Sequence, residues 1–271
     1  MENNEAVYEF YNGGAEIGRL ERGLGVVEFY RSKEIISRYL KGQLKIYDIG
    51  GGIGKYAEWL AGMGHEVSLI ELAPAAVEYA KEHMTIPYEA FAGDARDVDK
   101  PDNSADMVLL MGPLYHLLEK NERLRVLSEA NRVLKSGGIL IAAGISKFSS
   151  ATWALSVYGN NVFLDDDIYM NMIKREMDTG EHLKPAEYPY IISNAFFHTI
   201  GGLRDEISEA GFSIMESAAV EGCSWITPEL NEKWNDEFRR SRILEIIRAT
   251  EHEETMMGMS PHFLVCASKP D

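Results

Sequence analysis

The feature that most constrains the fold of this chain is a short apolar segment that runs directly into a cluster of glycines. Residues 45–49 (KIYDI) predict a β-strand, and Gly50, Gly51, Gly52 and Gly54 follow it before a helical pattern begins. Glycine lets the backbone approach a ligand closely, and the first turn of the next helix offers N–H groups to it. The arrangement therefore predicts a cradle for an anion or a nucleotide at the end of a strand.

Strands and helices alternate on both sides of this loop. Such an order predicts an α/β fold, in which a doubly wound, mostly parallel sheet carries helices on both faces. Further strands are expected at residues 66–72, 87–92, 106–111, 139–145, 212–220 and 262–267, and helices at residues 56–64, 74–84, 120–134 and 203–210.

The alternation is interrupted twice and is preceded by one amphipathic segment. We expect a single domain over residues 1–271, with residues 1–42 as an N-terminal helical cap. Residues 147–198 and 221–261 do not read as strand–helix units and are interpreted as insertions. Both leave the second half of the sheet, beyond strand ends where ligands bind in such folds. We therefore expect the two insertions to form a lid over an acceptor molecule.

Composition narrows the classes of partner. The net charge is −16, and an acidic surface repels phosphate backbones and anionic lipids, so neither nucleic acid nor a membrane is expected as a partner. The only cysteines are Cys223 and Cys266, which excludes a thiolate metal cluster, and no metal site is expected. No signal peptide and no apolar run of roughly 20 residues are present. The expectation is a cytoplasmic, globular monomer or homodimer.

The spacing of the glycines separates two kinds of nucleotide cradle. A dinucleotide-binding G-x-G-x-x-G that began at Gly50 would need a glycine where Lys55 stands. The chain instead has D-x-G-x-G-x-G from Asp48 to Gly54. Glu71 ends the next strand, where a carboxylate can accept both ribose hydroxyl hydrogens, although a dinucleotide site also uses an acid there. These residues favour a nucleoside ligand.

The order of the motifs resembles class I S-adenosylmethionine (SAM)-dependent methyltransferases of the small-molecule type. The resemblance rests on the loop from Asp48 to Gly54, on Glu71, on Gly93–Asp94–Ala95, and on GPLYHL at residues 112–117 followed by LKSGGIL. It implies a Rossmann-like methyltransferase fold with seven strands, the last of them antiparallel, and SAM as cofactor. The resemblance implies that Asp94 accepts the adenine amino group and that the backbone near Met111 receives the ammonium group. The cofactor-binding residues expected from all these signals are Asp48, Gly50, Gly51, Gly52, Gly54, Glu71, Leu72, Asp94, Ala95, Met111, Tyr11 and Arg31.

The acceptor side is less constrained. A sulfonium methyl group is already activated, so such a site mainly holds the reactants in line, and a base is needed only when the acceptor carries a proton. Tyr115 and His116 follow the fourth strand and His198 follows the first insertion, so these three are candidates for catalysis. Each histidine can equally be a packing or helix-start residue. Tyr11 could wall the site and Arg31 could bind the cofactor carboxylate, or lie on a solvated helix face.

The function predicted from the sequence is SAM-dependent methyl transfer to a small-molecule acceptor. Two alternatives stay open: a nicotinamide-dependent oxidoreductase on a related fold, and a SAM-binding protein without catalytic activity. Lys55 and Asp94 argue against the first of these. No sequence feature excludes the second.

Overall fold

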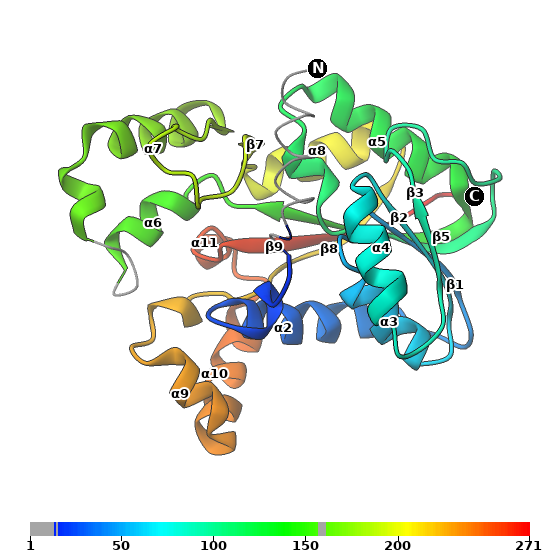
Figure 1. Cartoon of the computed structure of the whole chain (residues 1–271), viewed down its shortest axis with the longest axis horizontal. Helices are drawn as coiled ribbons and strands as arrows, with labels where there is room; N and C mark the ends of the chain where they lie inside the picture. Colours follow the sequence, from blue (N-terminus) through cyan, green and yellow to red (C-terminus); the bar gives the residue numbers. More distant parts are fainter. Residues whose placement is uncertain (1–13, 15, 157–160) are drawn as a thin grey trace.

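A seven-stranded sheet forms the centre of the computed structural model, which describes residues 14, 16–156 and 161–271 (Figure 1). The strand order is β3-β2-β1-β4-β5-β9-β8. All neighbouring pairs from β3 to β5 are parallel, whereas β9 is antiparallel to both β5 and β8. This confirms the expected fold class and its antiparallel last strand. The strands are β1 (Lys45–Ile49), β2 (Glu66–Glu71), β3 (Glu89–Ala92), β4 (Ala105–Leu110), β5 (Leu134–Ile145), β8 (Ser213–Ala219) and β9 (His262–Ser268).

Helices cover both faces of the sheet. Ile35 of α2 and Leu60 of α3 share one buried cluster with Leu109 of β4, whereas Leu127 of α5 and Ile207 of α8 lie in the cluster on the other face. Alternate strand residues face opposite clusters, as a sheet buried on both sides requires. No helix in the described ranges is long and apolar enough to cross a bilayer. The helices that cover the sheet are α2 (Gly25–Ser37), α3 (Lys55–Gly62), α4 (Pro74–His83), α5 (Lys120–Val133) and α8 (Ile200–Glu209), with the 3-10 turns η1 (Arg19–Glu21) and η2 (Pro113–His116).

The first insertion has a small core of its own. Tyr169, Met172 and Ile173 are buried against Ala154, and Phe163 stacks on Tyr169 with ring centroids 4.3 Å apart. Part of its aromatic content therefore serves internal packing. Its elements are α6 (Ser149–Leu155), η3 (Asn161–Asp165), α7 (Asp167–Thr179), β6 (Glu181–His182) and β7 (Ala195–Phe196).

The second insertion packs mainly against α2. Trp234 contacts Tyr30 edge to face at 5.6 Å, and Arg248 pairs with Glu34 at 2.6 Å. In the view of Figure 1 its helices α9 and α10 lie below β9, while α7 of the first insertion lies above it. The two insertions thus flank the start of β9 from different sides. Its elements are η4 (Ser224–Ile226), α9 (Leu230–Asn235), α10 (Glu237–Thr250) and α11 (Glu254–Met257).

Candidate cofactor and acceptor site

The glycine loop leaves β1 in a conformation that suits glycine alone. Gly50, Gly52 and Gly54 have φ values of 69°, 58° and 78°, in the left-handed region where a Cβ is costly. A Cβ on Gly50 would also lie 2.7 Å from Pro113 Cδ, in the segment after β4. The loop therefore approaches the end of β4 closely, and α3 begins directly behind it with its N-terminus toward the loop.

Asp48 lies buried beneath this loop. A Cβ on Gly51 would come within 2.7 Å of Asp48 Oδ1, so the two residues fit only without a side chain on the loop. Neither carboxylate oxygen has a hydrogen bond of good geometry to the described residues. Burial and the nearby charge of Glu71 raise the pKa of Asp48 to about 7, and the Ala57 backbone N–H offsets this only in part. Asp48 therefore supports the loop from below and does not line the cavities described next.

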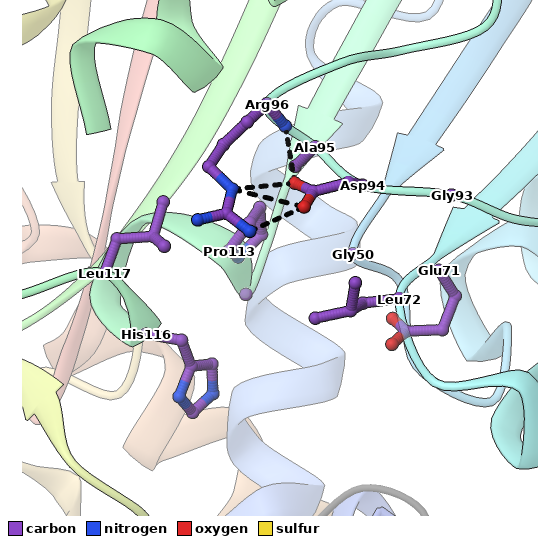
Figure 2. Close-up of a pocket in the computed structure, with 11 residues that line it drawn as sticks. Gly50, Glu71, Leu72, Gly93, Asp94, Ala95, Arg96, Pro113, His116 and Leu117 are labelled. Carbon is purple, nitrogen blue, oxygen red and sulfur yellow. Dashed lines mark hydrogen bonds and ion pairs between the residues drawn. The ribbon is translucent and has the colours of Figure 1, made fainter. Parts of the chain in front are cut away.

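A cavity of about 70 Å³ lies between the glycine loop and the ends of β2 and β3 (Figure 2). Glu71 lines it and accepts hydrogen bonds from the backbone N–H groups of Gly52 and Ala73, both at 2.9 Å. Each carboxylate oxygen keeps a second lone pair for a ligand hydroxyl. The other lining residues are Gly50, Leu72, Gly93, Asp94, Ala95, Arg96, Gly112, Pro113, His116 and Leu117. The structure thus brings together Gly50, Glu71, Leu72, Asp94 and Ala95.

Asp94 is already engaged by a neighbour that the sequence analysis did not single out. Arg96 donates to Oδ1 from Nε at 2.9 Å and to Oδ2 from Nη2 at 2.6 Å, as Figure 2 shows. Its backbone N–H also donates to Oδ1. Burial opposes ionisation, but these bonds outweigh it and lower the pKa of Asp94. An adenine amino group would share this carboxylate with Arg96.

His116 lines the same cavity, where its imidazole is only a weak base. Burial, together with the positive charge of Arg19, lowers the pKa of His116 to about 3. Its Nδ1 lies 3.4 Å from Ser193 Oγ. The imidazole is therefore neutral at physiological pH, which leaves His116 a packing and hydrogen-bonding role.

A second cavity, of about 40 Å³, continues on the other side of Gly50 and Gly112. Met111 and Tyr115 line it, and the Tyr115 hydroxyl donates to the Met111 carbonyl at 3.0 Å. That carbonyl keeps one lone pair, so the predicted contact with an ammonium group remains available to it. Gly51 and Gly52 line this cavity too.

The charged wall of the second cavity comes from the N-terminal cap. Arg19 donates to Glu28 at 2.6 Å and to Glu16 at 2.9 Å, and all three line the cavity. Arg19 was missed in the sequence analysis because the segment around η1 shows no periodic pattern, and Glu28 because it is one of several charged residues in the amphipathic segment that became α2. The arginine can pair with a ligand carboxylate, and the two glutamates can pair with positively charged groups of the same ligand.

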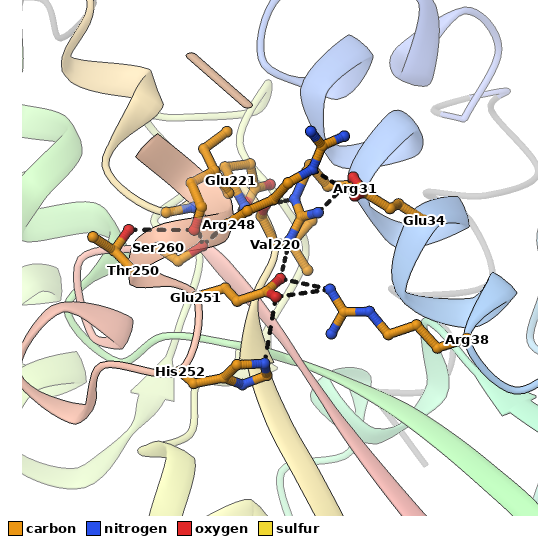
Figure 3. A network of polar contacts seen from close by, with 12 residues as sticks. Arg31, Glu34, Arg38, Val220, Glu221, Arg248, Thr250, Glu251, His252 and Ser260 are labelled. Carbon is orange, nitrogen blue, oxygen red and sulfur yellow. Dashed lines mark hydrogen bonds and ion pairs between the residues drawn. The ribbon is translucent and has the colours of Figure 1, made fainter. Parts of the chain in front are cut away.

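Arg31 does not reach this wall, contrary to the role expected for it. It is fully buried elsewhere, where it pairs with Glu251, donates to Glu34 at 2.6 Å and contacts the Val220 carbonyl (Figure 3). The network joins α2 to the residues after β8 and α10 and needs Arg31 for its own charge balance. Arg19, and not Arg31, is the arginine beside the glycine loop. Tyr11 lies outside the described residues.

His198 is likewise placed away from the cavities. It is buried, with Nε2 3.4 Å from Glu206 Oε2, and its ring packs edge to face on Phe196 at 4.7 Å. Burial lowers its pKa. It is not among the residues that line the three cavities described here. The structure therefore gives His198 a packing role between β7 and α8.

A third cavity, of about 340 Å³, opens where the first insertion meets the start of β9. His262 lines both this cavity and the second one, so its ring stands at their boundary. One signal could have found it: an antiparallel strand begins at the edge where its parallel neighbours end, and His262 is the first residue of β9. The aromatic lining residues are Trp153, Phe163, Tyr169, Phe197 and Trp225.

Comparisons with known proteins agree with this geometry. A model of the methyltransferase domain family matches residues 47–142. Ubiquinone biosynthesis O-methyltransferase from Xanthomonas euvesicatoria pv. vesicatoria is 27% identical over 161 residues, 56% of this chain and 61% of that protein. The enzyme of that name from Methylocella silvestris is 31% identical over 126 residues, 43% of this chain and 45% of its own. The match thus spans less than two thirds of these relatives.

Solved structures share the fold over more of the chain. A SAM-dependent methyltransferase from Methanosarcina mazei superposes with a TM-score of 0.59 at 22% identity, covering 87% of this chain and 97% of that one. One from Mesorhizobium loti gives 0.59 at 16% identity, with 88% and 98% covered. The [4+2]-cyclase SpnF gives 0.53 at 18% identity, with 89% and 81% covered.

The residues present fit the cofactor of this family. A Cβ on Gly52 would point toward Glu16 across the loop, at 3.3 Å from its Cγ, so the loop surface is open to a ligand only because it lacks side chains. Glu71 offers acceptors for ribose hydroxyls, and Arg19 with Glu28 offers charges for a carboxylate and an ammonium group. The chain therefore carries a class I SAM-dependent methyltransferase domain, and its cofactor is S-adenosylmethionine.

Proposed function

We propose that the protein transfers the methyl group of SAM to a small, partly apolar molecule held in the 340 Å³ cavity, which we call the acceptor cavity. The observation that carries this proposal is the shared wall: His262 lines the acceptor cavity and the cavity beside the glycine loop. A methyl donor on one side of that boundary would face an acceptor on the other. Such a transfer requires roughly 3–3.5 Å between the reacting atoms.

The chain's own residues would divide the work of binding. Glu71, held by two backbone N–H groups, would accept the ribose hydroxyls, and Arg19 with Glu28 would hold the charged end of the amino acid. SAM when bound supplies a methyl group on a sulfonium, which needs no further activation. What remains for the protein is to orient the acceptor and to exclude water.

The character of the acceptor cavity supports a small-molecule substrate. Its walls are mostly aromatic and aliphatic, and Trp153, Trp225 and Phe197 present flat apolar surfaces. Its volume suits one ring system with substituents. Relatives named ubiquinone biosynthesis O-methyltransferase point to the same class.

Both insertions contribute to this cavity. Trp153 and Tyr169 come from the first insertion and Trp225 from the second. We propose that residues 147–198 act as the larger part of the lid, because α9 and α10 of the second insertion pack mainly on α2. The N-terminal cap closes the cofactor side through Glu16 and Arg19.

Two other functions compete with this proposal: a nicotinamide-dependent oxidoreductase and a SAM-binding protein that transfers no methyl group. Lys55 in place of a third glycine disfavours a nicotinamide cofactor. The similarity to the [4+2]-cyclase SpnF means that the fold alone does not decide whether a methyl group is transferred. Transfer must therefore be measured directly.

The experiment uses SAM labelled in the methyl group, the purified protein, and either a panel of hydroxylated aromatic compounds or a bacterial extract. We expect label in solvent-extractable small molecules, and none when Gly52→Asp replaces the natural protein. Gly64→Ala, a substitution at a glycine far from the cavities, is the matched control. Label found only in precipitated protein or nucleic acid would refute a small-molecule acceptor, and tight SAM binding without any transfer would favour a non-catalytic role.

A further inference from the structure

A carboxylate–imidazole pair stands at the boundary between the cofactor and acceptor cavities. His262 Nδ1 lies 2.6 Å from Glu221 Oε1, and Glu221 is fully buried. An ionised carboxylate only accepts hydrogen bonds, so Nδ1 carries the proton and Nε2 is the nitrogen that remains for a ligand. Within the described ranges Nε2 has no hydrogen-bond partner, although the ring lines both cavities.

Glu221 is held rigidly in this orientation. Its Oε2 accepts the backbone N–H of His262 at 3.0 Å and lies 3.1 Å from Ser260 Oγ. Ser260 Oγ in turn accepts the backbone N–H groups of Glu221 and Gly222. The carboxylate therefore cannot turn away from the imidazole, and the pair has the geometry of a base oriented by a third group.

The other histidines near the cavities do not offer a free basic nitrogen. Burial and Arg19 lower the pKa of His116 to about 3, and His198 lies outside the cavities. His182 lines the acceptor cavity, but its Nδ1 is 2.6 Å from Glu176 Oε1 and its Nε2 is 3.2 Å from the Ile192 carbonyl. His262 is the histidine of this group that can take a proton from a molecule in the acceptor cavity.

The charges around His262 favour proton uptake. Glu28 of α2 has an oxygen 3.9 Å from Nδ1, and Arg19 of η1 faces the same group through Glu28. Burial opposes ionisation, but Glu221 and Glu28 outweigh both it and Arg19 and raise the pKa of His262 to about 9. The imidazole must lose its own proton before it acts as a base, and a sulfonium in the adjoining cavity favours that loss because like charges lower the pKa.

We propose that His262, oriented by Glu221, is the general base that removes the proton from a hydroxyl group of an aromatic acceptor. The proposal rests on the proposed function. The O–H bond of the acceptor breaks as its proton goes to Nε2. The oxygen uses the freed electron pair to bond the methyl carbon, the carbon–sulfur bond breaks, and its pair stays on sulfur. The products are a methyl ether, S-adenosylhomocysteine and an imidazolium that later loses its proton to water. His262 is a catalytic residue in this scheme and Glu221 a positioning residue.

The test follows the proton by absorbance, without turnover. The full chain is saturated with sinefungin, a SAM analogue in which an amine-bearing carbon replaces the methylated sulfur, and 4-nitrocatechol is added as a chromogenic acceptor probe. Its phenol and phenolate forms absorb at different wavelengths. We expect the bound probe to ionise at a pH about 1 unit or more below its value in solution, because the His262 imidazolium stabilises the phenolate. The shift should vanish in His262→Gln.

Two further variants keep the result interpretable. Glu221→Gln keeps the imidazole but removes the negative charge of its partner, so it should show a smaller shift, and it replaces His262→Gln if the latter does not fold. His83→Gln, an exposed histidine on α4, should keep the full shift. An undiminished shift in both site variants would overturn the role of His262. Absence of probe binding, or binding without a shift in the natural protein, would overturn the hydroxyaromatic acceptor. A protein that binds neither sinefungin nor SAM would instead refute the proposed function.

Discussion

Removal of the negative charge of the buried Asp48 carboxylate should make the protein more stable at high pH. Asp48 has no exposed surface and no hydrogen-bond partner of good geometry within the described residues, and Glu71 adds a like charge nearby. We therefore consider Asp48→Asn, which keeps the shape of the side chain and removes its charge. The substitution converts a buried ionisable group into a neutral one beneath the glycine loop.

The magnitude follows from the shift in the pKa of Asp48, from the ordinary 3.8 to about 7. Because the folded pKa is the higher one, the folded state binds more protons than the unfolded state between these values, and stability is lost as the pH rises from about 4 to about 7. At about 1.4 kcal/mol per unit, the full penalty above pH 7 is at most about 4 kcal/mol. At pH 5 less than half of it is present. Asp48→Asn itself leaves a buried amide unsatisfied, at a cost of about 1–3 kcal/mol at either pH.

The assay is urea unfolding of the cofactor-free protein, followed by tryptophan fluorescence at pH 5 and pH 8. We compare the free energy of unfolding of Asp48→Asn with that of the natural protein at each pH. We expect this difference to change by about 2–3 kcal/mol in favour of Asp48→Asn from pH 5 to pH 8. Asp99→Asn, at an exposed aspartate, is the matched control and should show no such change. An equal effect of Asp48→Asn at both pH values would show that Asp48 ionises normally and would refute the reasoning.

Three other predictions concern the glycine loop, Asp94 and the core. Gly52→Asp should lower SAM affinity more than about 100-fold, because Gly52 has a φ of 58° and a carboxylate there would face Glu16; unchanged calorimetric affinity would contradict this. Asp94→Ala should weaken SAM binding by about 1–2 kcal/mol, and less if Arg96 compensates, as measured in the same titration. Arg123→Met should lower the free energy of unfolding by about 3–5 kcal/mol, because it leaves Glu206 buried without its 2.7 Å partner. A Met pair at both positions should recover most of that loss, and a double variant as unstable as Arg123→Met would contradict it.

The predicted site residues that the structure brings to one cavity lie at the ends of parallel strands. Glu71 ends β2 and Asp94 follows β3, and parallel strands present their carboxyl ends at one edge of the sheet. A short motif after each strand is therefore enough to bring these side chains to one cavity. The glycine loop belongs to the same class of local signal, since its positive φ values are a property of three residues.

The rest of the site depends on contacts between distant parts of the chain. Arg31 and Arg19 both lie in the N-terminal cap, and only the packing of α2 on the segment from Val220 to Glu251 decides which of them faces the glycine loop. His262 is separated from Glu28 by most of the chain. β9 lies between β5 and β8, so its first residue reaches the edge where the cavities lie, but no local pattern indicates that Glu28 stands beside it there.

Calorimetric titration of the purified protein with SAM and, separately, with NADH tests the central claim most directly. We predict that SAM binds at one site, that Gly52→Asp abolishes this binding while Gly64→Ala preserves it, and that NADH does not bind. Binding of NADH without binding of SAM, or the same SAM affinity in Gly52→Asp as in the natural protein, would contradict the assignment of the glycine loop to S-adenosylmethionine.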